Sequence, residues 1–149
     1  MKKIVLLFAV FLLAACSKPS FKNVDITGSK SFGSNFELLD PNGQVKTMAD
    51  FKGKAVLIFF GYTHCPDVCP ATLIEMQEVM KALGPLSDRV QVIFITVDPQ
   101  RDTAELMAQY PPAFDSRFIG LRPANDEALA KLAKDFKMYY NKVPGGNPK

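Results

Sequence analysis

Two cysteines, Cys65 and Cys69, are the residues of this chain whose type and spacing are best suited to chemistry. They lie four positions apart in the segment GYTHCPDVCP, which spans residues 61–70. Side chains at this spacing on a regular helix have β-carbons about 5–6 Å apart, whereas a disulfide needs about 3.5–4.5 Å. Because Pro66 and Pro70 interrupt regular helix, the segment can bring the two sulfurs together. The pattern favours a redox-active or metal-binding pair, and the alternative is two buried, inert cysteines.

The residues on either side of the pair predict a strand before it and a helix after it. Residues 55–60 form a continuous apolar run, which is typical of a central strand covered on both faces. Pro70 is expected in the first turn of the helix, so Cys69 lies near the helix start and Cys65 in the preceding loop. Free backbone N–H groups and the positive end of the helix dipole favour a thiolate there. The apolar face of this helix is expected to carry Leu73, Met76, Met80 and Leu83, and Gly84-Pro85 is expected to end it.

Other side chains near the pair are weaker candidates for metal ligands. His64 is the only histidine, but it adjoins Cys65, so both side chains would have to turn toward one ion from successive residues. We expect a partly exposed loop histidine instead, and we expect Asp67 to start the helix. Met76 and Met80 are expected to fill the core rather than to bind copper.

The remaining sequence predicts alternating strands and helices, which indicate an α/β layer with parallel strand pairing. Asp98 lies at the end of one of these strands. A turn after the strand is sufficient to explain an aspartate at this position, although its side chain can also face the cysteine loop. Asp102 with Glu105 resembles a capping box, and Pro111 with Pro112 must end the helix that follows. The expected elements are a hairpin over residues 36–48, strands at 55–60, 90–97 and 118–121, helices after Pro70, after Asp102 and after Asn125 or Asp126, and the start of another strand at 138–143.

The first fifteen residues predict a secretory signal peptide. Lys2 and Lys3 precede an apolar run over residues 4–13, which is too short to span a bilayer. The sequence Leu-Ala-Ala-Cys that ends at Cys16 is similar to a bacterial lipobox, which implies a lipid on Cys16 and a mature N-terminus there. The alternative is an uncleaved membrane anchor with an incidental cysteine. Both interpretations place the domain outside the cytoplasm, and the first makes it a membrane-anchored bacterial lipoprotein on the periplasmic face.

Three regions follow from this division of the chain. Residues 1–15 are the signal peptide, residues 16–33 a lipid-anchored tether rich in Ser, Lys, Asn and Gly, and residues 34–149 a single domain. Without the two lysines of the signal, 16 Lys and Arg remain against 15 Asp and Glu. The remaining sequence is therefore near neutral and has no basic stripe, so nucleic acid is not an expected partner.

Several of these motifs together resemble the Sco/SenC family. The segments that carry the resemblance are DFKGK at residues 50–54, the cysteine motif at 61–70, TVDPQRDT at 96–103 and the two tyrosines at 139–140. The resemblance covers residues 36–149 and implies a thioredoxin-like fold, here with an N-terminal hairpin extension. It also implies copper binding, with Cys65 and Cys69 as copper ligands and redox pair, and a role in building the copper A centre of cytochrome c oxidase. Some members of the family act there as thiol–disulfide reductases.

The resemblance is incomplete at the C-terminal end. The family's third copper ligand is a histidine in a strand beyond residue 149, and the last strands and helix of the fold are also expected to be lacking. The predicted function is a metallochaperone that holds Cu(I) on two thiolates and passes it to the oxidase subunit carrying the copper A site. The alternatives are a thiol–disulfide oxidoreductase with its own exchange partners, and a non-functional truncated family member.

Overall fold

The computed structural model describes residues 28–29, 32–33 and 35–141. The predicted signal peptide and Cys16 lie outside the described residues, as does most of the predicted tether. Of the strand expected at residues 138–143, positions 142 and 143 lie outside them as well.

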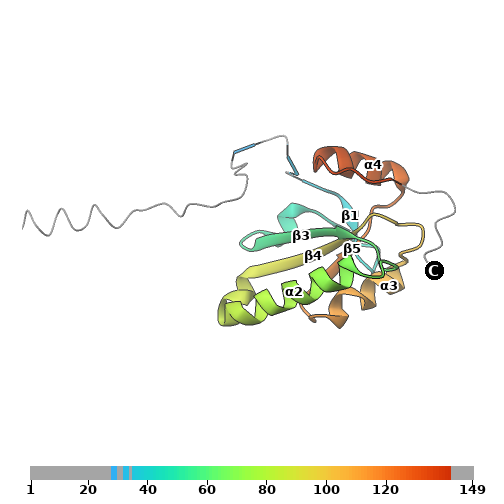
Figure 1. Cartoon of the computed structure of the whole chain (residues 1–149). Coiled ribbons are helices and arrows are strands. Elements are labelled where there is room, and N and C mark those ends of the chain that lie inside the picture. Colours follow the sequence, from blue (N-terminus) through green and yellow to red (C-terminus); the bar gives the residue numbers. More distant parts are fainter. Residues whose placement is uncertain (1–27, 30–31, 34, 142–149) are drawn as a thin grey trace, which may run out of the picture.

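Three layers make up the domain, with a parallel sheet in the middle (Figure 1). The sheet has the order β3-β4-β5, formed by β3 (Ala55–Gly61), β4 (Val90–Thr96) and β5 (Ile119–Leu121). The helices α2 (Val68–Leu83) and α3 (Ala104–Gln109) cover one face, and α4 (Asp126–Asp135) covers the other. The predicted α/β class with parallel pairing is therefore confirmed.

The central strand β4 supplies the core of both faces because its side chains alternate. Val92 and Phe94 are buried on the face of α2 and α3, while Ile93 and Ile95 are buried on the face of α4. The buried cluster on the face of α2 and α3, here called the first cluster, also contains Leu73, Met80, Met107 and Phe118. The buried cluster on the face of α4 also contains Phe36, Leu38, Leu121 and Leu132. Met76 packs against the first cluster, so the prediction that the helix methionines fill the core is confirmed.

Local sequence signals set most element boundaries as expected. The predicted hairpin is formed by β1 (Leu38–Leu39) and β2 (Val45–Lys46), and Gly43 in its turn has a φ of 77°. A 3-10 turn, η1 (Met48–Phe51), leads from the hairpin toward β3. At the start of α4, the Asn125 side chain accepts a hydrogen bond of 2.8 Å from the backbone N–H of Ala128. After α3, the two prolines continue as η3 (Pro111–Ala113), because proline cannot continue a regular α-helix.

Two expectations about the sheet were wrong. Within the described residues β3 is an edge strand rather than a central one, because β4 pairs with it on one side only and Leu57 stays 40% exposed. Residues 138–141, expected to begin another strand, follow α4 without forming one. Side chains of β3 nevertheless pack on both faces of the sheet, because Val56, Ile58 and Phe60 contact the cluster on the α4 face while Phe59 contacts the cluster on the α2 face. The apolar run of β3 therefore reflects cover on both faces, as expected, without a central place in the sheet.

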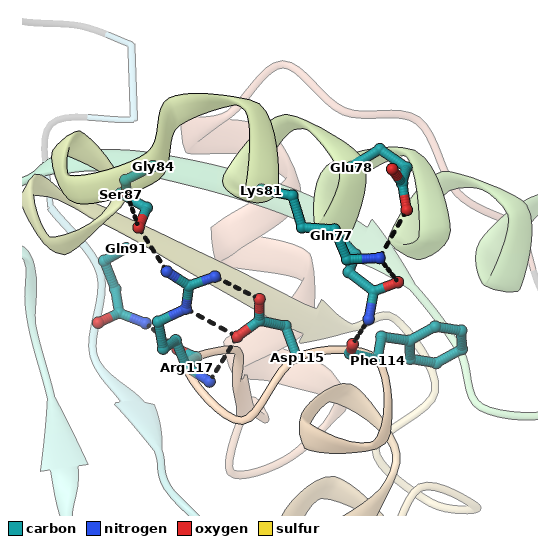
Figure 2. Close-up of polar contacts among 9 residues, drawn as sticks. All are labelled: Gln77, Glu78, Lys81, Gly84, Ser87, Gln91, Phe114, Asp115 and Arg117. Atoms are coloured by element: carbon teal, nitrogen blue, oxygen red, sulfur yellow. Dashed lines mark hydrogen bonds and ion pairs between the residues drawn. The ribbon is translucent and has the colours of Figure 1, made fainter.

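Polar contacts fix the far end of α2 to the segment that leads into β5 (Figure 2). The Gln77 amide donates to the carbonyl of Phe114, and the Arg117 guanidinium donates to Asp115 and to the hydroxyl of Ser87 in η2 (Gly84–Arg89). The hydrogen bond from Arg117 is the main reason that the pKa of Asp115 is lowered. These contacts lie away from the N-terminal end of α2, which carries the cysteine pair. None of the helices in the described part of the chain has the length and apolar character needed to cross a membrane.

Candidate metal centre

The cysteine pair lies where β3 ends and α2 begins, at the carboxyl edge of the parallel sheet. Asp67 is the N-cap residue of α2, so Cys69 is the second residue of the helix and Pro70 belongs to its first turn. Cys65 lies in the preceding loop, in a turn that its own N–H closes onto the carbonyl of Tyr62 at 3.2 Å. The predicted placement of both cysteines, and of Asp67 at the helix start, is confirmed.

The two thiols are neighbours in space as well as in sequence. The backbone N–H of Cys69 donates to the Cys65 sulfur across 3.4 Å, so Cys65 folds back over the first turn of α2. Both cysteines are free thiols; Cys69 is buried, with 5% of its surface exposed, and Cys65 is only partly buried. An accessible sulfur and a buried one thus meet at a helix N-terminus, where negative charge is stabilised.

Electrostatics distinguish the two sulfurs. Burial opposes ionisation of Cys65, but hydrogen bonds from the backbone of Asp67 and from Cys69 outweigh it and lower the pKa of Cys65. Burial raises the pKa of Cys69 to about 11, and the nearby Cys65 sulfur and Asp102 carboxylate act in the same direction. Because the thiolate is the reactive and metal-binding form, Cys65 is the sulfur that engages first.

A glycine makes room for the buried sulfur. A β-carbon on Gly61, the last residue of β3, would lie 3.0 Å from the Cys69 sulfur and 2.8 Å from the Phe94 ring. No side chain fits there without displacing one of these neighbours. The sequence analysis did not single out Gly61, although a glycine that directly follows an apolar strand and precedes a reactive loop is a signal of close approach.

Asp102 binds the cysteine loop instead of capping α3, so the predicted capping box is wrong. The N-cap of α3 is Thr103, whose hydroxyl accepts from the N–H of Leu106. Asp102 instead points inward and is 0% exposed, and its carboxylate accepts from the N–H and hydroxyl of Thr63 and from the hydroxyl of Thr96. The signal that was missed is a second capping residue, Thr103, directly after Asp102, which frees the aspartate for another role.

Asp98, just after the end of β4, and His64, within the cysteine loop, make different contacts. The Asp98 carboxylate pairs with Arg101, whose guanidinium lies 6.0 Å from the centre of the Tyr62 ring. The His64 side chain is 50% exposed, and its Nδ1 lies 3.1 Å from the Thr63 hydroxyl and 3.7 Å from the Asp102 carboxylate. The expectation of a partly exposed loop histidine is confirmed.

Two thiols are the donor set that the structure offers to a metal. Among residues 28–29, 32–33 and 35–141, no group of three or more His, Cys, Asp or Glu side chains is placed to hold one ion. Two thiolates suit Cu(I), which is soft and accepts low coordination, better than Cu(II). The donor chemistry therefore fits Cu(I).

An apolar hollow of about 550 Å³ gives access to the pair. Its walls are the end of β3, the two cysteines and the segment over residues 138–140, which includes the 88% exposed Tyr139. Tyr62 also lines the hollow, and burial raises its pKa, with further contributions from the Cys65 thiol. A partner group that reaches Cys65 through this hollow meets apolar and aromatic surface.

Most of the chain matches a known family model. Residues 24–149 match the model described as SCO1/SenC. The chain belongs to the SCO1/SenC family. It is 43% identical over 112 residues to the mitochondrial protein SCO2 homolog of Bos taurus, a match that covers 74% of this chain and 42% of the bovine one. It is 35% identical over 140 residues to a SCO2-like protein of Rickettsia felis, covering 93% of this chain and 68% of the relative. This Sco/SenC chain therefore spans less than half the length of the bovine relative.

Solved Sco structures share the fold. The structure of Bradyrhizobium japonicum ScoI with copper bound superimposes with a TM-score of 0.70 at 45% identity, covering 79% of this chain and 74% of that one. The apo Sco1 protein of Thermus thermophilus superimposes with a TM-score of 0.73 at 38% identity, covering 87% and 73% respectively. Yeast Sco1 with copper bound gives 0.70 at 29% identity, covering 79% and 65%. The thioredoxin-like fold expected from the sequence is thereby confirmed.

Proposed function

We propose that this Sco/SenC chain is a copper chaperone that holds one Cu(I) between Cys65 and Cys69. The observation that carries the proposal is the 3.4 Å contact between the Cys69 N–H and the Cys65 sulfur, which sets the thiols side by side at a helix N-terminus. The copper-bound Bradyrhizobium japonicum relative supports the choice of metal. The proposed acceptor is the copper A centre of cytochrome c oxidase, as the family resemblance implies.

Delivery by ligand exchange follows from the unequal exposure of the two sulfurs. Two thiolates on one Cu(I) carry a net negative charge, which the positive end of α2 stabilises. An incoming ligand of the acceptor displaces the more accessible Cys65 sulfur first, while buried Cys69 retains the ion. Displacement of Cys69 then completes the transfer, and copper remains Cu(I) throughout, so no electron donor or acceptor is needed.

The redox state of the pair provides the test. We expect the reduced protein to bind one Cu(I) per chain in anaerobic competition with a chromophoric chelator. Oxidation to the Cys65–Cys69 disulfide should remove this binding, and dithiothreitol should restore it, because a disulfide has no thiolate to offer. Tight Cu(I) binding that persists in the oxidised protein would contradict the proposal. Transfer from the loaded protein to the apo copper A domain of the oxidase subunit tests delivery.

A second candidate function, thiol–disulfide exchange, is favoured by the opposite pKa shifts of the two cysteines. In this reaction the Cys65 thiolate attacks a substrate disulfide, forms a mixed disulfide and releases one substrate thiolate. Cys69, after losing its proton, attacks the Cys65 sulfur and releases the second substrate thiolate. The substrate gains two electrons and becomes a dithiol, while the protein is oxidised to the Cys65–Cys69 disulfide.

The unequal pKa values predict unequal alkylation. We expect iodoacetamide to modify Cys65 at neutral pH, because its lowered pKa makes the thiolate available there. Cys69 should react at a comparable rate only as the pH approaches 11, where its own thiolate appears. Peptide mass spectrometry after timed quenching measures both rates in one sample, with urea-unfolded protein as the reference. Equal rates in the folded protein at neutral pH would remove the assignment of Cys65 as the attacking sulfur.

The membrane location is a proposal about residues that the structure does not describe. We infer from the lipobox-like sequence that the mature chain begins at an acylated Cys16, followed by the tether up to residue 33. Mass spectrometry of the membrane fraction should show a lipid on an N-terminal Cys16. An unmodified chain that begins at Met1 would contradict this inference.

A further inference from the structure

Asp102 is a buried carboxylate whose hydrogen bonds all lead to the cysteine loop or to the end of β4. It is 0% exposed and accepts from the Thr63 N–H at 3.0 Å, from the Thr63 hydroxyl at 2.6 Å and from the Thr96 hydroxyl at 2.5 Å. The described residues place no Lys or Arg in an ion pair with it, and the Nδ1 atom of the half-exposed His64 lies 3.7 Å from its carboxylate. Burying a carboxylate without a close cation is costly, so the hydrogen bonds that it accepts must offset this cost.

A continuous set of contacts joins this carboxylate to the cysteines. Asp102 is brought back over the sheet edge by a turn in which its N–H donates to the Asp98 carbonyl at 2.9 Å. It then holds Thr63, and the next turn is closed by the bond from the Cys65 N–H to the Tyr62 carbonyl. Cys65 ends the path, because its sulfur accepts from the Cys69 N–H. The position of the Cys65 sulfur thus depends on where Asp102 holds Thr63.

The links to the two threonines serve different purposes. Thr96 is the last residue of β4, and its hydroxyl also accepts from the Asp98 N–H at 2.9 Å, so it ties the carboxylate to the rigid sheet. Thr63 belongs to the loop and is separated from Asp102 by 39 residues. The carboxylate therefore bridges a fixed strand end and the loop that carries the more accessible sulfur.

We propose that Asp102 is a positioning residue that, by binding Thr63 while anchored on Thr96, holds the Cys65 sulfur next to Cys69 so that both bind one Cu(I). This inference rests on the proposed copper-binding function. It extends that function to a residue that contacts neither sulfur nor metal. Losing a group that only orients a metal ligand costs about 10–100-fold in affinity.

The test compares three variants of the mature protein. Asp102→Asn keeps the shape but halves the acceptor capacity, and Thr63→Val removes the loop hydroxyl alone. Asp115→Asn is the control, because Asp115 is also a mostly buried carboxylate with several hydrogen bonds but lies before β5, at the opposite end of the sheet. Each variant is measured for Cu(I) affinity, for the equilibrium constant of Cys65–Cys69 disulfide formation in glutathione buffers, and for urea unfolding.

We expect Asp102→Asn to lower the Cu(I) affinity and the disulfide equilibrium constant by about 10-fold each, because both depend on holding the sulfurs together. Thr63→Val should change both in the same direction, by a smaller factor. The control should unfold more easily while keeping both constants within about twofold of the unaltered protein. A role in stability alone would move the unfolding curves of all three variants and neither constant.

The outcomes separate this inference from the proposed function. If Asp102→Asn and Thr63→Val match the control in both constants, the inference is wrong, whether or not the unaltered protein binds Cu(I). If the unaltered protein binds no Cu(I), the proposed function fails, and the disulfide constant still decides whether Asp102 positions the pair. Should Asp102→Asn not fold, Thr63→Val decides the question by the same two constants.

Discussion

Replacing either Cys65 or Cys69 with serine is expected to abolish tight Cu(I) binding. A serine hydroxyl has nearly the shape of the thiol, but its oxygen is a hard donor that does not hold Cu(I). The loss should exceed the roughly 100-fold that follows from losing a group which merely supports a ligand. Competition with a chromophoric Cu(I) chelator measures it, and circular dichroism checks that each variant is folded.

The matched control for this prediction is His64→Ala. His64 is half exposed and its ring nitrogen contacts the Thr63 hydroxyl, so its removal should change Cu(I) affinity by only a few-fold. If His64→Ala removes binding as completely as a cysteine change does, His64 is a third ligand and the two-thiol site is wrong. If a single serine variant retains full affinity, the remaining cysteine binds without its partner and the bridging arrangement fails.

Gly61→Ala is expected to damage both the fold and the site. The added methyl group would lie 2.8 Å from the Phe94 ring and 3.0 Å from the Cys69 sulfur, and both of these neighbours are buried. Overpacking of this kind costs about 1–3 kcal/mol of unfolding free energy. Relief by movement of Cys69 would also separate the sulfurs, so the folded variant should lose Cu(I) affinity by about 10-fold or more.

A second glycine provides the control for this substitution. A β-carbon on Gly120 in β5 would lie 2.5 Å from the Met107 carbonyl, which is a clash as severe but involves no cysteine. Gly120→Ala should therefore lower the midpoint of urea unfolding without changing the Cu(I) affinity of the molecules that remain folded. An equal loss of affinity in both variants would show that general loosening, rather than displacement of Cys69, weakens the site.

The sequence alone determined the features that depend on neighbouring residues. Pro66 and Pro70 keep the cysteine segment from forming a regular helix, which placed Cys65 in the loop and Cys69 in the first turn of α2. Turn residues and helical periodicity likewise predicted the N-terminal hairpin and the apolar face of α2. Such signals are local because proline geometry, turn chemistry and side-chain spacing act within a few residues of one another.

Only the tertiary structure decided the features that depend on segments far apart in the chain. An apolar strand has the same sequence pattern at the edge of a sheet as at its centre, so the edge position of β3 among the described strands became visible only with the strand order. The bond from Thr63 to Asp102 spans 39 residues, and no local pattern distinguishes such an aspartate from a helix cap. The need for glycine at position 61 arises from the Phe94 ring and the Cys69 sulfur, which belong to β4 and α2. Contacts of this kind form only when the layers pack, because packing alone brings these groups within a few ångströms of one another.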